Sequence, residues 1–173
     1  MKKIISNRGI VKLLVLTAFF YFNLSISSAQ PDLPQRDITI TATQAIHFGT
    51  FVLTGAGGGT VVLGHNGSRN STGDVALSAL APAAQPAIFD IKLCQGRNVT
   101  ITYDPTTTLT GSNGGSFTLN LGPTEKGVSG SQFPVNNDCN FITTLRVGGT
   151  LNIPGGSPAG TYTGNIFITF EQE

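Results

Sequence analysis

The sequence predicts an all-β fold, and three features of its composition and patterning support that class. Charged residues make up only 11% of the chain, whereas 22 of its 173 residues are glycine. Segments in which apolar and polar residues alternate recur at intervals of roughly ten residues, as expected for half-buried strands. The nearest approach to a helix, VALSALAPAAQPA at 75–87, is interrupted by Pro82 and Pro86. We therefore expect a single immunoglobulin-like or Greek-key β-sandwich of about nine short strands, with a small closed barrel as the competing architecture.

Alternation of side chains places candidate strands along most of the chain. The segment 122–140 lacks alternation and is expected to form a long irregular surface loop. A hairpin is expected from strands at 60–63 and 74–77, joined by a segment rich in glycine, asparagine and serine. The other expected strands lie at 38–42, within 45–53, and at 87–93, 97–103, 106–111, 116–121 and 141–147.

The last stretch, 147–170, is expected to form two strands joined by a loop rich in proline and glycine at 154–160. In the second of these strands, Tyr162, Ile166, Ile168 and Phe170 recur with a period of two and therefore share one face. We expect this face to be buried against the preceding strands.

The N-terminal region has the three-part pattern of a secretory signal peptide. Four basic residues precede residue 13, an apolar run covers 13–22, and small residues occupy 27–29. The apolar run is shorter than the roughly 20 residues that a membrane span needs, which disfavours a membrane anchor. We predict a signal peptide over 1–29, a flexible polar leader over 30–36 and a β-sandwich domain over 37–173.

The charge balance argues against a nucleic-acid partner. The predicted signal peptide holds four of the ten basic residues and none of the nine acidic ones, so the remaining chain has a net charge of −3 (6 − 9). Its basic residues are scattered, whereas phosphate recognition needs clustered lysine and arginine. We expect an exported protein, located in the periplasm, at the cell surface or outside the cell, with no membrane span after signal cleavage.

Cys94 and Cys139 are the two cysteines of the chain. In an oxidising compartment such a pair is expected to form a disulfide. Two free thiols or a metal-binding pair are the alternatives, but two cysteines without nearby histidine do not make a zinc site. We expect a disulfide, no metal and no cofactor.

The motifs that carry chemistry in other proteins are weak or absent. GAGGGT at 55–60 lacks the third glycine and the following helix of a dinucleotide-binding loop. His47 is expected to face solvent and His65 to lie in a turn, while Asp90 and Asp104 are catalytic candidates by residue type alone. NNDCN at 136–140 offers oxygen ligands but a single carboxylate, so a disulfide-anchored turn is favoured over a calcium loop. We expect no catalytic residues and no enzymatic activity.

Three segments together resemble a family of secreted bacterial domains, domain-of-unknown-function family 4402. The resemblance rests on Phe48-Gly49 near the start of the domain, on Gly149-Thr150-Leu151, and on Gly160-Thr161-Tyr162-Thr163-Gly164 near its end. It spans nearly all of the chain after the predicted signal peptide. The family is similar in character to fimbrial subunits, which are secreted, all-β and low in charge, and the resemblance implies no catalytic residues.

These observations lead to the expectation of an exported structural or adhesive protein, either a pilin-like or a cell-surface subunit. Its mechanism would be self-association by β-strand addition, or pairing with another surface protein, with Ile38, Ile40 and Ala42 as the candidate donor strand. The alternative is a monomeric secreted module that binds glycans or proteins. For glycans, Tyr103, Phe117 and Tyr162 are the plausible aromatic platforms, although periodicity turns both tyrosines inward.

Overall fold

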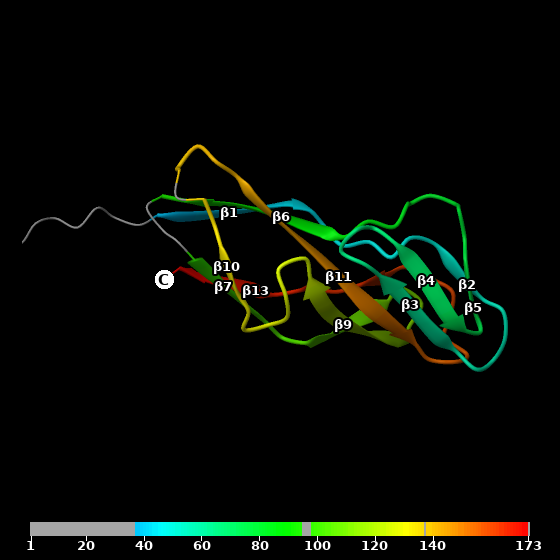
Figure 1. Cartoon of the computed structure of the whole chain (residues 1–173). Coiled ribbons are helices and arrows are strands. Elements are labelled where there is room, and N and C mark those ends of the chain that lie inside the picture. The colour runs from blue at the N-terminus through cyan, green and yellow to red at the C-terminus, as the bar shows by residue number, and fades with distance from the viewer. Residues whose placement is uncertain (1–36, 95–97, 137, 173) are drawn as a thin grey trace, which may run out of the picture. The chain divides into compact units, whose positions relative to one another are not determined.

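The computed structural model describes residues 37–94, 98–136 and 138–172, so the predicted signal peptide (1–29) and leader (30–36) lie outside the described residues. Within these ranges the chain forms antiparallel strands and no helix, which confirms the all-β prediction (Figure 1). The described residues form thirteen strands, more than the nine or so that were expected. They are β1 (Ile38–Gln44), β2 (Phe51–Leu53), β3 (Gly59–Leu63), β4 (Arg69–Gly73), β5 (Val75–Leu77), β6 (Ala87–Leu93), β7 (Asn98–Tyr103), β8 (Thr106–Gly111), β9 (Ser116–Thr124), β10 (Gln132–Pro134), β11 (Thr143–Ile153), β12 (Tyr162–Thr163) and β13 (Ile168–Gln172).

The largest sheet is built around β11. One edge of β11 pairs with β6 over residues 143–147 and then with β3 over residues 149–153, while the other edge pairs with β9. The sheet therefore has the order β1-β6-β11-β9-β8-β12, with β3 and β4 branching from the second half of β11 (Figure 1). The expected boundary after residue 147 is wrong, because the glycines at 148–149 continue the strand. A Cβ at Gly149 would lie 2.8 Å from the carbonyl oxygen of Asn120, so a side chain would not fit beside β9.

A second sheet of order β10-β7-β13 packs against the first, and β2 and β5 form a separate pair. The ring of Phe89 on β6 lies 5.7 Å from the ring of Phe170 on β13, which shows that the two sheets face each other. This packing agrees with the predicted sandwich. The most deeply buried side chains come from both sheets and are Val61, Leu63, Ile91, Leu93, Val99, Ile101, Leu119, Leu145 and Val147.

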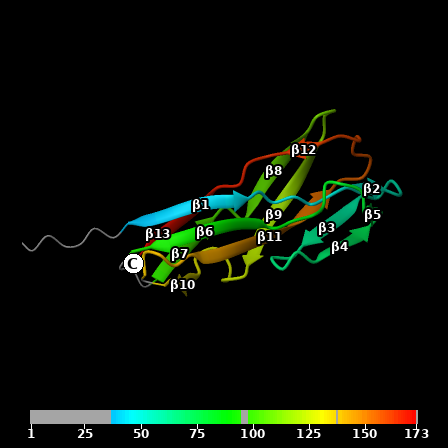
Figure 2. The same ribbon diagram turned by 90° about the horizontal axis from the view of Figure 1, so that it is seen from above.

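The C-terminal segment runs antiparallel to β7 and β8 in turn. Tyr162 pairs with Gly111 on β8, and Ile168 pairs with Tyr103 on β7. Between these ladders the hydroxyl of Thr107 donates to the carbonyl oxygen of Asn165 (3.0 Å). Figure 2 shows this segment passing from beside β8 to β13. The single strand expected after residue 161 is therefore two short strands, because its partner changes sheets where β7 ends and β8 begins.

The hairpin expected between 60–63 and 74–77 is wrong in its second strand. β3 pairs instead with β4, the polar segment RNSTG, and Val75–Leu77 forms β5, which pairs with β2. The alternation of apolar residues does not reveal β4, because main-chain hydrogen bonds form its ladder with β3. Its polar side chains suit its mostly exposed position. The hydroxyl groups of Thr60 and Thr72 lie 2.7 Å apart across this pair.

The segment 122–140 is more ordered than the loop that the sequence predicts. β9 continues to Thr124, and β10 pairs with β7. Phe133 and Val135 are both buried. Only a three-residue ladder forms here, which is too short for alternation to stand out in the sequence.

Arg69 joins the β3–β4 hairpin to the β2–β5 pair. Its guanidinium donates to the carbonyl oxygens of Phe48 (2.9 Å) and Ser78 (2.7 Å), with a longer contact to Thr50 (3.4 Å). The guanidinium occupies the space that a side chain at position 49 would need, and Gly49 also has a φ of 73°, which few other residues adopt. This arrangement accounts for the Phe48-Gly49 pair that the sequence analysis singled out.

We predict that Arg69→Lys lowers the free energy of unfolding by about 2 kcal/mol, because an ammonium group cannot reach the separate carbonyl oxygens that the guanidinium fork reaches. Chemical denaturation measures the effect. Arg146→Lys is the matched control, since Arg146 is an exposed partner in a surface ion pair with Glu125 (3.1 Å) and should change stability by less than about 1 kcal/mol. Equal losses in the two variants would contradict this role of Arg69.

Candidate strand-pairing edges

The predicted donor strand forms an edge of the largest sheet. β1 pairs antiparallel with β6, with Ile38 opposite Leu93, Ile40 opposite Ile91 and Ala42 opposite Phe89. Ile38 and Ile40 are half-buried and pack against the core, whereas Ala42 is exposed. The structure thus gives the donor strand an intramolecular partner on one side.

The other side of β1 presents free backbone groups. Cys94 donates its N–H to the carbonyl oxygen of Asp37 (3.2 Å), which makes Asp37 and Cys94 a hydrogen-bonded pair. Hydrogen-bonded and non-hydrogen-bonded pairs alternate along an antiparallel ladder, so Thr39 and Thr41 bond to β6. The N–H and C=O groups of the three donor residues, Ile38, Ile40 and Ala42, consequently point away from β6. β1 ends the sheet order, so no described strand pairs with this edge.

Two features hold the far end of β1. A register shift falls between Ala42 and Gln44, which bends the strand where its ladder ends. The hydroxyl of Thr43 donates to the carbonyl oxygen of Ile88 (3.3 Å), and the side-chain amide of Gln44 donates to that of Pro86 (2.7 Å). Side-chain hydrogen bonds therefore fix the strand at this bend, whereas the core packing of Ile38 and Ile40 and the main-chain ladder with β6 hold it between 37 and 41.

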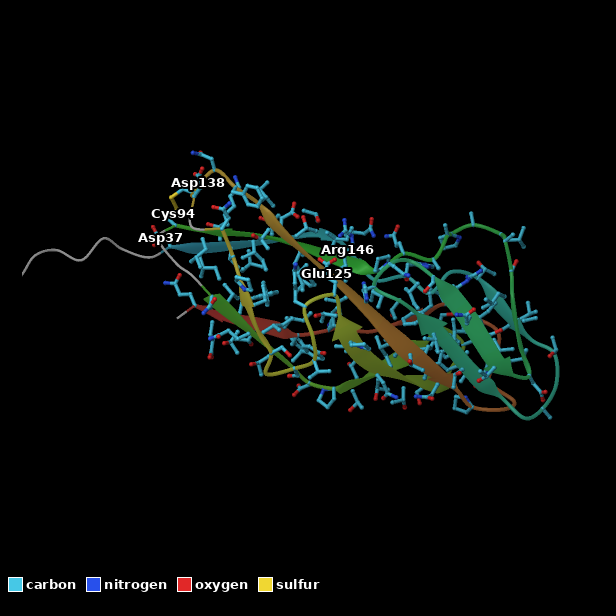
Figure 3. The ribbon with its side chains drawn as sticks, viewed as in Figure 1. Asp37, Cys94, Glu125, Asp138 and Arg146 are labelled. Atoms are coloured by element: carbon cyan, nitrogen blue, oxygen red, sulfur yellow. A yellow bond between two sulfur atoms is a disulfide. The ribbon has the colours of Figure 1, made fainter. Side chains whose placement is uncertain are left out.

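The strand beneath β1 is anchored covalently. Cys94, at the end of β6, is joined to Cys139, which precedes β11, as the sequence predicts. Figure 3 shows Cys94 near Asp37 and Asp138 at this end of the sheet. The disulfide ties the partner of β1 to the central strand of the same sheet, so β6 stays in place whether or not β1 is paired with it.

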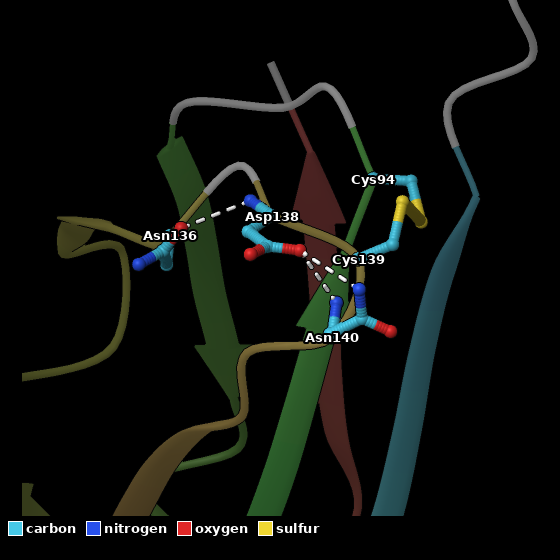
Figure 4. Close-up of a disulfide and its surroundings, with 5 residues drawn as sticks. All are labelled: Cys94, Asn136, Asp138, Cys139 and Asn140. Carbon is cyan, nitrogen blue, oxygen red and sulfur yellow. Dashed lines mark hydrogen bonds between the residues drawn. A yellow bond between two sulfur atoms is a disulfide. The ribbon is translucent and has the colours of Figure 1, made fainter.

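The NNDCN segment forms a turn around this disulfide. The carboxylate of Asp138 accepts from the backbone N–H of Asn140 (2.9 Å) and from its side-chain amide (3.3 Å), and Asn136 accepts from the N–H of Asp138 (2.9 Å) (Figure 4). Asn137 lies outside the described residues. The single carboxylate is engaged by its own turn, and among the described residues no group of three or more His, Cys, Asp or Glu side chains could hold a metal ion.

The remaining chemical candidates lie in separate structural settings. Nδ1 of His47 accepts from the N–H of Gly49 (2.8 Å), and Asp90 accepts from the hydroxyl of Thr144 (3.1 Å). In the 55–60 loop, the N–H of Gly57 donates to the carboxylate of Asp74 (2.8 Å). The carboxylate of Asp74 therefore occupies the backbone N–H group of Gly57, which a bound phosphate would need as a hydrogen-bond donor.

The aromatic candidates are packed within the domain. Phe117 is buried, and Tyr162 stacks on it with ring centroids 3.5 Å apart. The hydroxyl of Tyr162 donates to the carbonyl oxygen of Pro158 (2.8 Å). The residues expected to share the buried face of the C-terminal segment are all half-buried and pack against the core; they are Tyr162, Ile166, Ile168 and Phe170. Phe167, which lies between Ile166 and Ile168, is 74% exposed. Stacking and burial leave no open ring face at Phe117.

Tyr103 is also buried, with 7% of its surface exposed. Burial raises the pKa of its phenol above the ordinary value, while a hydrogen bond from Ser129 acts in the opposite direction. The signal that identifies this residue in the sequence is its register with Val99 and Ile101, which are both fully buried.

The fold and these edges define a class, an all-β domain whose described part has edge strands without a second partner strand and in which Tyr103, Phe117 and Tyr162 are packed. Residues 38–171 match the family described as "Domain of unknown function (DUF4402)", and the chain belongs to this family. Comparison with curated proteins and with solved structures gave no significant match.

The residues that carry the family resemblance are packing residues in this structure. Phe48 is buried, and its ring lies 3.6 Å from the position that a Cβ of Gly149 would take. Gly49 makes room for Arg69, and Tyr162 stacks on Phe117. Arg69 is the important residue that sequence reasoning missed, because it was one of several scattered cations and nothing in its neighbourhood indicated burial.

We predict that Tyr103→Phe flattens the alkaline limb of the stability profile. Because the folded-state pKa of Tyr103 is raised, its contribution is fully present below the unfolded-state pKa of about 10 and is lost as the pH rises further. The measurement is the free energy of unfolding between pH 8 and pH 11.5 for both chains. Identical slopes above pH 10 would contradict the assignment.

We also predict that replacing both cysteines by serine lowers the free energy of unfolding by up to about 4 kcal/mol, as the loop-entropy model gives for a sequence separation of 45. Because Cys94 donates to Asp37, amide exchange at Thr39 and Thr41, which bond to β6, should also accelerate. Denaturation and hydrogen exchange with and without reductant measure both effects. Unchanged exchange at Thr39 and Thr41 would show that the disulfide does not support β1.

Proposed function

We propose that this chain is an exported structural subunit, pilin-like or adhesive in role and without catalytic activity, that associates with itself by β-strand addition. β1 is the proposed donor strand. The observation that carries the proposal is the one-sided pairing of β1, which leaves the backbone groups of Ile38, Ile40 and Ala42 without a partner strand among the described residues. An unpaired edge of this kind is a template for pairing with another chain.

Two features support the export part of the proposal. Residues 1–29 have the pattern of a signal peptide. Cys94 and Cys139 form a disulfide, a bond that persists in oxidising compartments. A separate finding is that no helical segment in the described part of the chain has the length and apolar character of a membrane span.

Few side chains of β1 are committed to its own subunit. Only two of its side chains, Ile38 and Ile40, pack against the core. Full burial of an isoleucine side chain contributes about 1.5–3 kcal/mol, so two half-buried ones hold the strand with a few kcal/mol. A neighbouring copy that pairs with the outer edge of β1 would add main-chain hydrogen bonds while the contacts with β6 are kept.

The alternative function is a monomeric secreted module that binds glycans or proteins. Phe117 and Tyr162 are engaged with each other, and Tyr103 is buried, so these aromatic residues do not support a sugar platform. Phe141 and Phe167 are 52% and 74% exposed and are the aromatic side chains that such a module would present. The two functions differ in oligomeric state.

The proposal predicts that the exported chain forms a ladder of multimers, and that removal of residues 30–42 abolishes the ladder but leaves a soluble monomer. Size exclusion with light scattering measures both, with the disulfide intact. Removal of 30–36 alone is the matched control, since it spares β1 and should leave the multimers unchanged.

Two outcomes would overturn this proposal. A full-length chain that stays monomeric over a wide concentration range would favour the binding module, and glycan and protein screens would follow. Collapse of the truncated chain would show that β1 is indispensable to its own domain. A peptide of residues 37–44 added in trans distinguishes collapse from loss of the donor, because it should restore a domain that has an empty β1 site, whereas a scrambled peptide should not.

A further inference from the structure

We propose that the outer edge of β13 accepts β1 from a second copy of this chain, so that the β10-β7-β13 sheet of one subunit continues into the β1-β6-β11 sheet of the next. This inference rests on the proposed function, because it names the surface that receives the donor strand. β1 keeps its own partner β6 and uses only its free edge.

The free edge of β13 follows from the bonds of its neighbour β7. Ile101 donates to the carbonyl oxygen of Ser131 (3.1 Å) and accepts from the N–H of Gly130 (2.8 Å), so its backbone points away from β13. The next residue along, Thr102, therefore bonds to β13, opposite Thr169. By the same alternation, Ile168 and Phe170 direct their N–H and C=O groups outward, and β13 pairs with no second strand among the described residues.

The two free edges match in pattern. On β1 the outward backbone groups belong to Ile38 and Ile40, and on β13 they belong to Ile168 and Phe170. All four side chains are half-buried and pack against the core. Edge-to-edge pairing would place these four inward side chains in one row and complete their burial, while Thr39 and Thr169 remain on the exposed face.

Most other edges in the described part of the chain are blocked or short. β10 contains Pro134, which lacks an N–H group, and β2, β5 and β12 have at most three residues. β4 is flanked by the segment that follows it, because the hydroxyl of Ser71 donates to the carbonyl oxygen of Val75 (2.8 Å). β1 and β13, with seven and five residues, contain neither lysine nor proline.

Charge and symmetry favour a second copy as the occupant. β1 carries no charged side chain and β13 carries only Glu171, so no like charges oppose each other across the contact. A pair made from two different edges is heterologous, and such a contact repeats without closing unless its rotation completes a ring. Pairing of β1 with β1 would close as a dimer and could not build the multimers that the proposed function requires. The pairing of β1 with β13 can build such multimers, because each subunit then uses one edge as donor and another as acceptor.

Single-cysteine cross-linking tests the acceptor. No free cysteine is present in the described chain, so an added cysteine is a unique thiol. Full chains carrying Thr39→Cys or Thr41→Cys are co-expressed with a chain carrying Thr169→Cys and then mildly oxidised. All three positions are exposed. We expect covalent dimers, because neighbouring strands lie about 4.8 Å apart and a disulfide needs a Cα separation of roughly 4.4–6.8 Å.

Thr102→Cys is the matched control for Thr169→Cys. Thr102 is exposed and lies directly opposite Thr169, but on the inner strand β7. One further strand spacing should reduce cross-linking on the order of tenfold. Equal yields at positions 102 and 169 would overturn the proposal.

Two further combinations of cysteine variants distinguish an error in the acceptor strand from an error in the proposed function. Covalent dimers from Thr41→Cys chains alone would show that β1 pairs with β1, which overturns the acceptor assignment. Covalent dimers between Thr39→Cys and Lys92→Cys chains would show that β1 moves onto a neighbour's β6, because Thr39 and Lys92 are opposite each other. That result overturns the β13 acceptor but retains strand donation. Failure of the native chain to associate overturns both proposals.

Discussion

The pairing of β11 with three strands is the constraint on which the rest of the structure depends. Its first half holds β6, its second half holds β3, and β9 lies along its other edge. The passage from β6 to β3 takes place at Gly148 and Gly149. A Cβ at Gly148 would meet the backbone of Leu63 and His65, so both glycines allow neighbouring backbones to approach closely. This close approach brings the β3–β4 hairpin into the same sheet as β1.

The sequence predicted most strands whose apolar residues alternate. β1, β6, β7, β8 and β9 lie where alternation indicated them, and the burial along β6 and β7 follows the same period of two. The errors have a common physical origin. β4 is polar because its ladder uses only backbone groups, β10 is short, and β12 and β13 are separate because their partner strands belong to different sheets. Alternation reports side-chain environment and carries no information on these three properties.

The candidate edges were only partly accessible to sequence reasoning. Alternation identified Ile38, Ile40 and Ala42 as a strand, but the direction in which their backbone groups point depends on the pairing with Cys94. The role of Arg69 depends on carbonyl oxygens that are separated in sequence by up to thirty residues and that meet only in the fold. The family residues Phe48, Gly149 and Tyr162 have packing roles for the same reason, since their partners lie on other strands.

The order of pairing along the chain has a consequence for the export proposed above. Strands β3, β6 and β9 all precede β11 in the sequence, yet each needs β11 as a partner. A chain that crosses a membrane with its N-terminus first therefore cannot complete the pairing of these three strands with β11 until residue 153 has emerged. Before that point, the apolar faces of three strands lack their central partner. Non-local pairing of this kind is slow and leaves the chain prone to aggregation. A holding factor on the far side of the membrane would act on this interval, between the emergence of β3 and that of β11.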